Sequence, residues 1–240
     1  MSSRPVVVPV KGHPGLRVST RSGRVSITAE ERSDVLIEEG APPEDEIEID
    51  ASGQVTLTSA RFGSASLQVR CPTGTDVVVG TASGRVELRG SLGLVLVTTV
   101  SGSIDVERAE GLDIRSVSGS IHVDRCAGRC RLQTTSGKAT VGSADDTDVS
   151  TVSGQVQLGW ASGRIRVRSA SGQVQVGTLG GGDVAVRTLS GSVRVDVPAN
   201  VRPSVRLSSL SGRPRCDCEE GGDCQITVSS MSGEIEVLPS

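Results

Sequence analysis

Apolar and polar residues alternate along most of this chain, and the alternation restarts after each Ser-Gly step. The segment Ser118–Val123 shows the pattern, because Ser-Gly is followed there by a polar residue and then by Ile, His and Val. The same phrase starts at five other serines, namely Ser101, Ser153, Ser171, Ser190 and Ser232. A period of two puts apolar side chains on one face of a strand and polar ones on the other. Each phrase therefore predicts a half-buried β-strand.

The Ser-Gly steps are evenly spaced from residue 83 onward. They begin at Ser83, Ser101, Ser118, Ser136, Ser153, Ser171, Ser190, Ser211 and Ser232, and are separated by 17 to 21 residues. A second apolar column stands four residues before most of these serines: Val97, Ile114, Leu132, Val149, Val167, Val186, Leu207 and Val228. Each repeat thus holds two short strands. A unit this small buries its apolar face only by stacking on its neighbours.

The repeat predicts an all-β fold, a right-handed parallel β-solenoid (β-helix) with coils of about 18 residues. Nine Ser-Gly steps, stacked at the spacing of neighbouring strands, make a rod of about 40 Å. The alternative is an antiparallel β-sandwich, because a short repeat of strands also suits meanders.

The repeat also divides the chain. Residues 1–80 carry the Ser-Gly phrase only at Ser22 and Ser52, and we interpret them as an N-terminal β-strand region, partly hairpins, that caps one end of the array. Residues 81–240 form the solenoid, which continues from the cap as one domain. At the other end, the glutamates and proline of the segment 234–239 are typical of a protected edge strand.

Composition narrows the function classes. Aromatic residues make up 1% of the chain, with Phe62 and Trp160 as the two examples, so the platforms that bind sugars and single-stranded nucleic acids are nearly absent. The 25 basic and 28 acidic residues give a net charge of −3, which provides no basic field for nucleic acid. We expect Trp160 to pack at a corner, and it is the residue to test as a contact point.

No apolar run approaches the length that crosses a bilayer, and the first residues lack the core of a signal peptide. The expectation is a cytoplasmic protein without a membrane segment, in which the six cysteines are reduced.

Cysteines offer the clearest candidate chemistry. Cys216, Cys218 and Cys224 lie in an acidic segment, and could bind zinc with Glu220 or Asp223 as a fourth ligand. The competing interpretation puts Cys216 and Cys224 at inward core positions, and no second Cys-x2-Cys pair completes a zinc framework. We predict no metal ligand here, although the sequence leaves the question open.

The remaining candidates have weaker support. Cys126 and Cys130 flank a turn and are interpreted as core residues rather than as a redox pair. His13 lies in a terminal loop and His122 at an outward polar position, and no nucleophile is linked to either by a motif. Asp145, Asp146 and Asp148 lack the repeated spacing of a calcium-binding roll and are assigned to a solvated turn. We therefore predict no catalytic, cofactor-binding or metal site and no cofactor.

A second sequence pattern, which leads into the first evenly spaced Ser-Gly step, resembles that of a known family. A strand ending in Cys71-Pro72-Thr73-Gly74 leads into the valines 77–79 and then into Ser83-Gly84-Arg85-Val86, with a partial echo at 195–207. Together with the Ser-Gly array, this resembles the bacterial "putative adhesin" family of β-strand-repeat proteins, a domain of unknown function, over roughly residues 16–238. The resemblance implies the repeat fold and offers no catalytic residues.

The prediction is a non-catalytic structural or interaction module, not an enzyme. It would present polar ladders to a protein partner or to another copy; the ladders are Gln155 and Gln173, and Arg164, Arg166 and Arg168. One alternative is a self-assembling solenoid scaffold. Another is a carbohydrate-active or carbohydrate-binding β-helix, although carbohydrate is disfavoured because the outward column Asp105, His122, Thr140 and Gln157 holds no acidic cluster.

Overall fold

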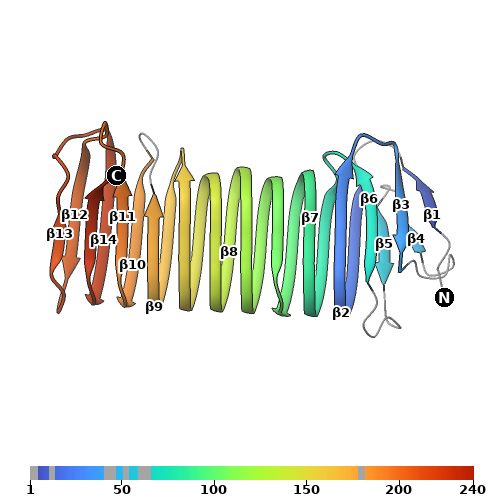
Figure 1. Cartoon of the computed structure of the whole chain (residues 1–240), viewed down its shortest axis with the longest axis horizontal. Helices are drawn as coiled ribbons and strands as arrows, with labels where there is room; N and C mark the ends of the chain where they lie inside the picture. Colours follow the sequence, from blue (N-terminus) through green and yellow to red (C-terminus); the bar gives the residue numbers. More distant parts are fainter. Residues whose placement is uncertain (1–4, 11–13, 41–46, 51–53, 59–65, 178–181) are drawn as a thin grey trace. The chain divides into compact units, whose positions relative to one another are not determined.

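A computed structural model describes residues 5–10, 14–40, 47–50, 54–58, 66–177 and 182–240. Two residues considered above, His13 and Phe62, and the Ser-Gly step at Ser52 lie outside these ranges. The chain forms two compact units, residues 1–122 and 123–240, and each is described by itself. The described elements are all β-strands, which confirms the all-β prediction (Figure 1).

The first unit begins with six short or medium strands and ends with two long ones. These are β1 (Val6–Pro9), β2 (Gly15–Glu30), β3 (Asp34–Glu39), β4 (Ile47–Ile49), β5 (Val55–Thr58), β6 (Leu67–Pro72), β7 (Asp76–Ser101) and the start of β8 (Ile104–Ala161). The second unit holds the rest of β8 and seven further strands: β9 (Ile165–Gly177), β10 (Val184–Ser190), β11 (Val193–Val197), β12 (Pro203–Ser209), β13 (Pro214–Cys216), β14 (Cys224–Ser232) and β15 (Ile235–Pro239).

Parallel pairing dominates the first unit, as the repeat predicts. Strand β2 pairs with β7 in parallel from Gly15 opposite Asp76 to Thr28 opposite Arg89, so the ladder already includes this early strand. Strands β7 and β8 continue the parallel ladder. The antiparallel pairs of this unit are β1–β3, β3–β6 and β4–β5, which makes the sheet mixed rather than purely parallel. The right-handed coiling, the coil of about 18 residues and the boundary at residue 80 stay predictions.

Strand order in the second unit departs from chain order. Strand β14 pairs in parallel with β10 on one side and with β12 on the other. Strand β15 likewise lies between β11 and β13. The last two strands of the chain are thus inserted between earlier ones. The prediction that residues 234–239 form the protected edge is wrong, because β12 and β13 are outermost.

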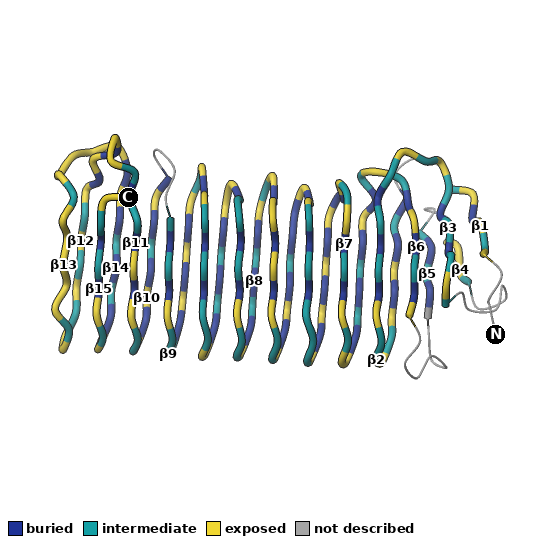
Figure 2. The backbone as a smooth tube through the Cα atoms, viewed as in Figure 1, coloured by how far each residue is buried: buried dark blue, intermediate teal, exposed yellow. Residues whose placement is uncertain are grey.

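The core is a thin layer of aliphatic side chains between the two strand layers. Burial alternates residue by residue along the strands (Figure 2). In β9, Ile165 and Val167 are 0% and 1% exposed, and they are in register with Val184 and Val186 of β10. Full burial of each such side chain stabilises the fold by roughly 1.5–3 kcal/mol.

A column of buried hydroxyl residues stands two positions before the Ser-Gly serines. The Thr188 hydroxyl donates a hydrogen bond to the carbonyl oxygen of Ser190 at 3.0 Å, and Ser230 does the same to Ser232 at 2.9 Å. Thr99 and Ser116 of the first unit bond in the same way to the carbonyls of Ser101 and Ser118. The bond occupies the buried hydroxyl and fixes the corner before the glycine.

Two members of this column should respond differently to the same substitution. Thr188→Val should lower the free energy of unfolding by about 1 kcal/mol, because a buried hydrogen bond is lost. Thr151→Val should leave it unchanged or raise it, since the Thr151 hydroxyl is buried without a hydrogen-bond partner. Urea denaturation followed by circular dichroism measures both. Equal destabilisation by the two substitutions would contradict the assignment.

Candidate functional site

The second unit carries a hollow lined by arginines. Alternation along β9 turns Arg166 and Arg168 outward while Ile165 and Val167 point into the core, and Arg164 precedes the strand. The hollow has a volume of about 240 Å³ and is lined by Arg129, Asp146, Thr147, Asp148, Arg164 and Arg166. Three arginines therefore line one depression.

The aspartates of this hollow are partly engaged by the protein itself. One carboxylate oxygen of Asp146 accepts the backbone N–H of Arg164 at 2.8 Å. Asp148 lies 3.8 Å from Arg168, which is a long ion pair between partly exposed groups. Within the described part of the chain, Arg129, Arg164 and Arg166 form no ion pair. The hollow therefore has donors free for an anionic group.

A second hollow lies beside the tryptophan. It has a volume of about 420 Å³, and its lining includes Trp160, Gln157, Gln175, Gly159 and Gly177. The indole is 51% exposed, although the sequence interpretation assigned it to corner packing. The amide of Gln175 donates to a carboxylate oxygen of Asp196 at 3.1 Å, so these two polar groups are paired within the protein.

The three cysteines of the acidic segment differ in environment. Cys216 is exposed on the outermost strand β13, opposite Val237 of β15, whereas Cys224 is buried. Burial, with the nearby Cys216 thiol, raises the pKa of Cys218 to about 11. Among the residues that the structure describes, no group of three or more His, Cys, Asp or Glu side chains is arranged to hold a metal ion.

The other cysteines are buried. Cys126 and Cys130 hydrogen-bond to each other, which lowers the pKa of Cys126, while the same bond and burial raise that of Cys130. Cys71 of the first unit is fully enclosed, and burial raises its pKa to about 11. Inward positions of this kind are those of small core residues.

The rate of alkylation should distinguish the exposed cysteines from the buried ones. At about pH 8 iodoacetamide should label Cys216 in the native protein, while Cys71, Cys126, Cys130 and Cys224 stay protected by burial. Labelling of Cys218 should rise about tenfold per pH unit toward its pKa, because only the thiolate reacts. Peptide mass spectrometry reads each site, and urea-unfolded protein is the control. Rapid native labelling of Cys71 would contradict the burial.

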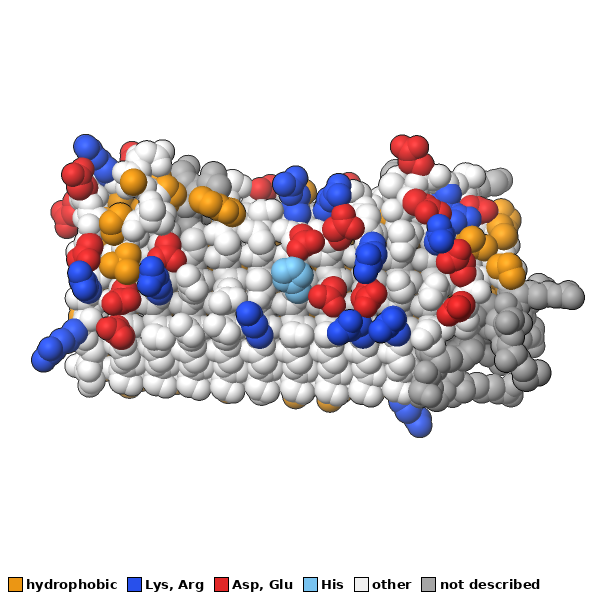
Figure 3. All heavy atoms as spheres, viewed as in Figure 1, with side chains coloured by type: hydrophobic (Ala, Val, Ile, Leu, Met, Phe, Trp, Pro, Cys, Tyr) orange, Lys and Arg blue, Asp and Glu red, His pale blue; other side chains and the backbone are white. Residues whose placement is uncertain are grey.

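The structure places the remaining candidates on the surface. His122 is exposed on β8, as its outward column predicts. Asp145 and Asp146 are exposed, and Asp145 accepts a hydrogen bond from the Ser162 hydroxyl at 2.7 Å. On the side drawn in Figure 3, acidic and basic side chains are interspersed in both units.

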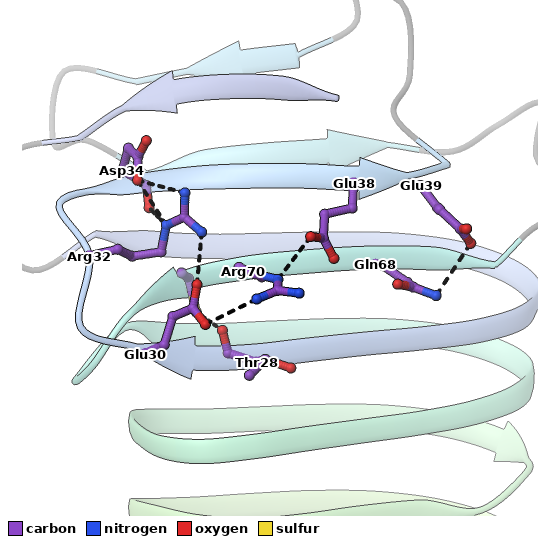
Figure 4. Close-up of polar contacts among 9 residues, drawn as sticks. Thr28, Glu30, Arg32, Asp34, Glu38, Glu39, Gln68 and Arg70 are labelled. Carbon is purple, nitrogen blue, oxygen red and sulfur yellow. Dashed lines mark hydrogen bonds and ion pairs between the residues drawn. The ribbon is translucent and has the colours of Figure 1, made fainter. Parts of the chain in front are cut away.

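A charged cluster ties together the first strands of the first unit. Arg70 of β6 lies between Glu30 of β2 and Glu38 of β3, at 3.3 and 2.9 Å (Figure 4). Arg32 pairs with Glu30 at 3.0 Å and with Asp34 at 2.8 Å. These ion pairs connect β2, β3 and β6, strands that pair in different directions. Exposed pairs of this kind contribute little energy each.

Sequence reasoning found part of the arginine hollow. It named Arg164 and Arg166, with Arg168 beside them, from their alternation, but missed Arg129, which the fold brings in from two repeats earlier in the chain. The available signal was the spacing: Arg129 precedes Arg164 by 35 residues, close to two repeats, so both occupy the same corner column.

Comparison with known proteins identifies the family. Residues 95–238 match the family described as Toastrack DUF4097. The chain belongs to this family. DUF4097 is a domain of unknown function, in agreement with the resemblance drawn from the Ser-Gly array. No curated protein matches the chain.

Several solved structures are similar to this member of the family. A "putative adhesin" from Bacteroides fragilis shares 12% identity, covering 97% of this chain and 95% of that one, with a TM-score of 0.39. One from Parabacteroides distasonis has 12% identity, the same coverage and a TM-score of 0.40. A third, from Parabacteroides merdae, has 10% identity, again the same coverage, and a TM-score of 0.41. In the described part of the chain, no helix has the length and apolar character to cross a membrane.

Proposed function

We propose that this DUF4097 chain is a non-catalytic interaction module that presents flat polar surfaces to a protein partner. The observation that supports it most is the regular outward ladder of the second unit. Gln155 and Gln173 lie side by side on successive turns, with their amides 3.5 Å apart, and Arg168 and Arg187 are in register on β9 and β10. Rigid parallel ladders hold such groups at fixed spacing, which suits recognition of an extended surface.

The described residues support a non-enzymatic role in a second way. Both aspartates of the arginine hollow are engaged within the protein, Asp146 by the backbone N–H of Arg164 and Asp148 by the side chain of Arg168. A general acid and base would need to face a common substrate position. The cytoplasmic location stays a prediction.

Site-specific photo-crosslinking in the source cells tests this proposal. Benzoylphenylalanine at Gln173 and at Arg187 samples the two faces, and Gly222, which has nothing within 4 Å of an added Cβ, is the loop control. We expect one crosslinked protein of constant mass from at least one face and none from residue 222. Absence of a crosslink from both faces, or cleavage of a polysaccharide panel by the purified chain, would refute it.

One observation favours self-assembly as a second candidate function. Strands β12 and β13 each have one paired neighbour among the described strands, and the inward side chains Val205 and Leu207 are only half-buried. Unpaired edges of this kind template association. Pro203 and Pro214 oppose it, because proline lacks the N–H donor that an added strand needs. Light scattering at increasing protein concentration distinguishes a growing assembly from a fixed species.

A further inference from the structure

The arginines of the second unit are concentrated on one strand layer. Arg164, Arg166 and Arg168 follow one another at alternate positions, and all three are exposed. Arg187 of β10 is directly opposite Arg168, and Arg129 completes the hollow from two repeats earlier in the chain. A chain with a net charge of −3 thus gathers five arginines around a hollow in which Asp146 and Asp148 are the acidic residues.

This arrangement is unfavourable for the isolated protein. Like charges directly opposite each other on neighbouring strands are destabilising. Asp148 offsets Arg168 across 3.8 Å, but Arg187 has no carboxylate partner among the described residues, and neither do the three arginines of the hollow. By contrast, Arg194 and Arg215 of the same unit are paired with Asp196 and Asp217 at 2.7 and 2.6 Å. An external anion would supply the negative charge that these arginines lack as a partner within the described part of the protein.

We propose that the arginines 129, 164, 166, 168 and 187 bind an extended acidic segment of a partner protein. The inference rests on the proposed function and names the partner chemistry. Outward residues of β9 recur every second position, about 6.6 Å apart, which is also the spacing of same-side residues in an extended peptide. Carboxylates at alternate positions of the partner can therefore meet Arg164, Arg166 and Arg168 one to one.

The chemistry of the hollow favours carboxylates on a peptide over a nucleic-acid strand. Guanidinium groups bind carboxylates through two parallel hydrogen bonds, and the depression of about 240 Å³ accommodates a carboxylate side chain. The described lining also contains no aromatic side chain on which bases could stack.

Fluorescence anisotropy with a labelled peptide of alternating glutamate and serine tests the inference on the full chain. We expect binding that weakens with salt and is absent for the matched glutamine–serine peptide. Arg164→Gln with Arg166→Gln should weaken binding at least about tenfold. Arg194→Gln with Arg215→Gln changes the net charge equally but removes arginines that are already paired, so its affinity should stay within about twofold of the original.

Three results would overturn the inference. The first is no binding of the glutamate peptide, and the second is an equal loss in both double variants, which would indicate bulk charge alone. The third is tighter binding of an oligothymidine of equal length, which would point to nucleic acid. Crosslinking from Gln173 would remain in any of these cases if the interaction function holds, so the two failures are distinguishable.

Discussion

Gly172→Ala should destabilise the protein by about 3 kcal/mol or more, a large share of the stability of a typical domain. Gly172 has a φ of +138°, and a Cβ added there would lie 2.0 Å from the carbonyl oxygen of Gly154 on the neighbouring turn. Both the strained backbone and the clash oppose any side chain, and the contact is with backbone that cannot rotate away. Urea denaturation of the variant measures the loss.

Gly222→Ala is the matched control for this substitution. Gly222 lies in the same unit, and a Cβ there meets nothing within 4 Å. We expect its free energy of unfolding to change by less than about 0.5 kcal/mol. If Gly172→Ala proves equally mild, the close approach of successive corners is not required for the fold.

The same geometry explains why the Ser-Gly step organises the chain. In the second unit Gly154, Gly172, Gly191 and Gly233 all have positive φ, and each added Cβ would approach the carbonyl oxygen of the preceding glycine in the stack to 2.2 Å or less. The motif is therefore a geometric requirement of the corner rather than a chemical site. This is why a regular motif predicted the fold well and the function poorly.

Burial follows directly from local alternation, so the sequence predicts it. The second-half column is buried at Val167, Val186 and Val228, which are 1%, 0% and 0% exposed. The hydroxyl column was equally visible, since Thr188 and Ser230 each stand two residues before a Ser-Gly serine. It went unpredicted because serine and threonine are ordinarily assigned to the outward side of a strand.

Strand order could not be derived from the repeat. The steps at Ser211 and Ser232 are nearly identical in pattern, so the repeat does not say which of the two turns is outermost. Their flanking residues carry weak signals. Pro203 and Pro214 mark strands that suit an edge, whereas Ile226 and Val228 of β14 form an uninterrupted apolar pair and are fully buried.

The candidate site also combines features that local alternation predicts with features that depend on how the strands pair. Alternation along a single strand predicted the outward arginines of β9. The pairing of Arg187 with Arg168 and the approach of Arg129 depend on register between strands, which is set by how neighbouring turns stack. The local alternation therefore predicts the row of outward arginines, whereas the hollow they help to line follows only from how the turns stack.

Deletion of residues 223–240 should expose β12 and β13 to protease, although both strands remain in the shortened chain. In the structure β12 pairs with β14 and β13 pairs with β15, so the deletion removes the neighbours recorded for each. Trypsin should then cleave after Arg206 and Arg215 at least about a hundredfold faster than in the full chain, because local opening no longer costs free energy. Limited digestion followed by mass spectrometry measures both sites.

The deletion also distinguishes the two possible strand orders. If β14 and β15 were outermost, as chain order predicts, their removal would leave β12 and β13 paired and resistant to trypsin. Deletion of residues 199–240 is the control, because it removes all four strands and leaves β10 and β11 paired with β9. Resistance after Arg166 and Arg187 in that control, together with rapid cleavage after Arg206 in the shorter deletion, would show that the end of the chain holds the outermost strands in place. Among the described strands, the outer strands β12 and β13 therefore depend for their pairing on β14 and β15, which follow them in the sequence.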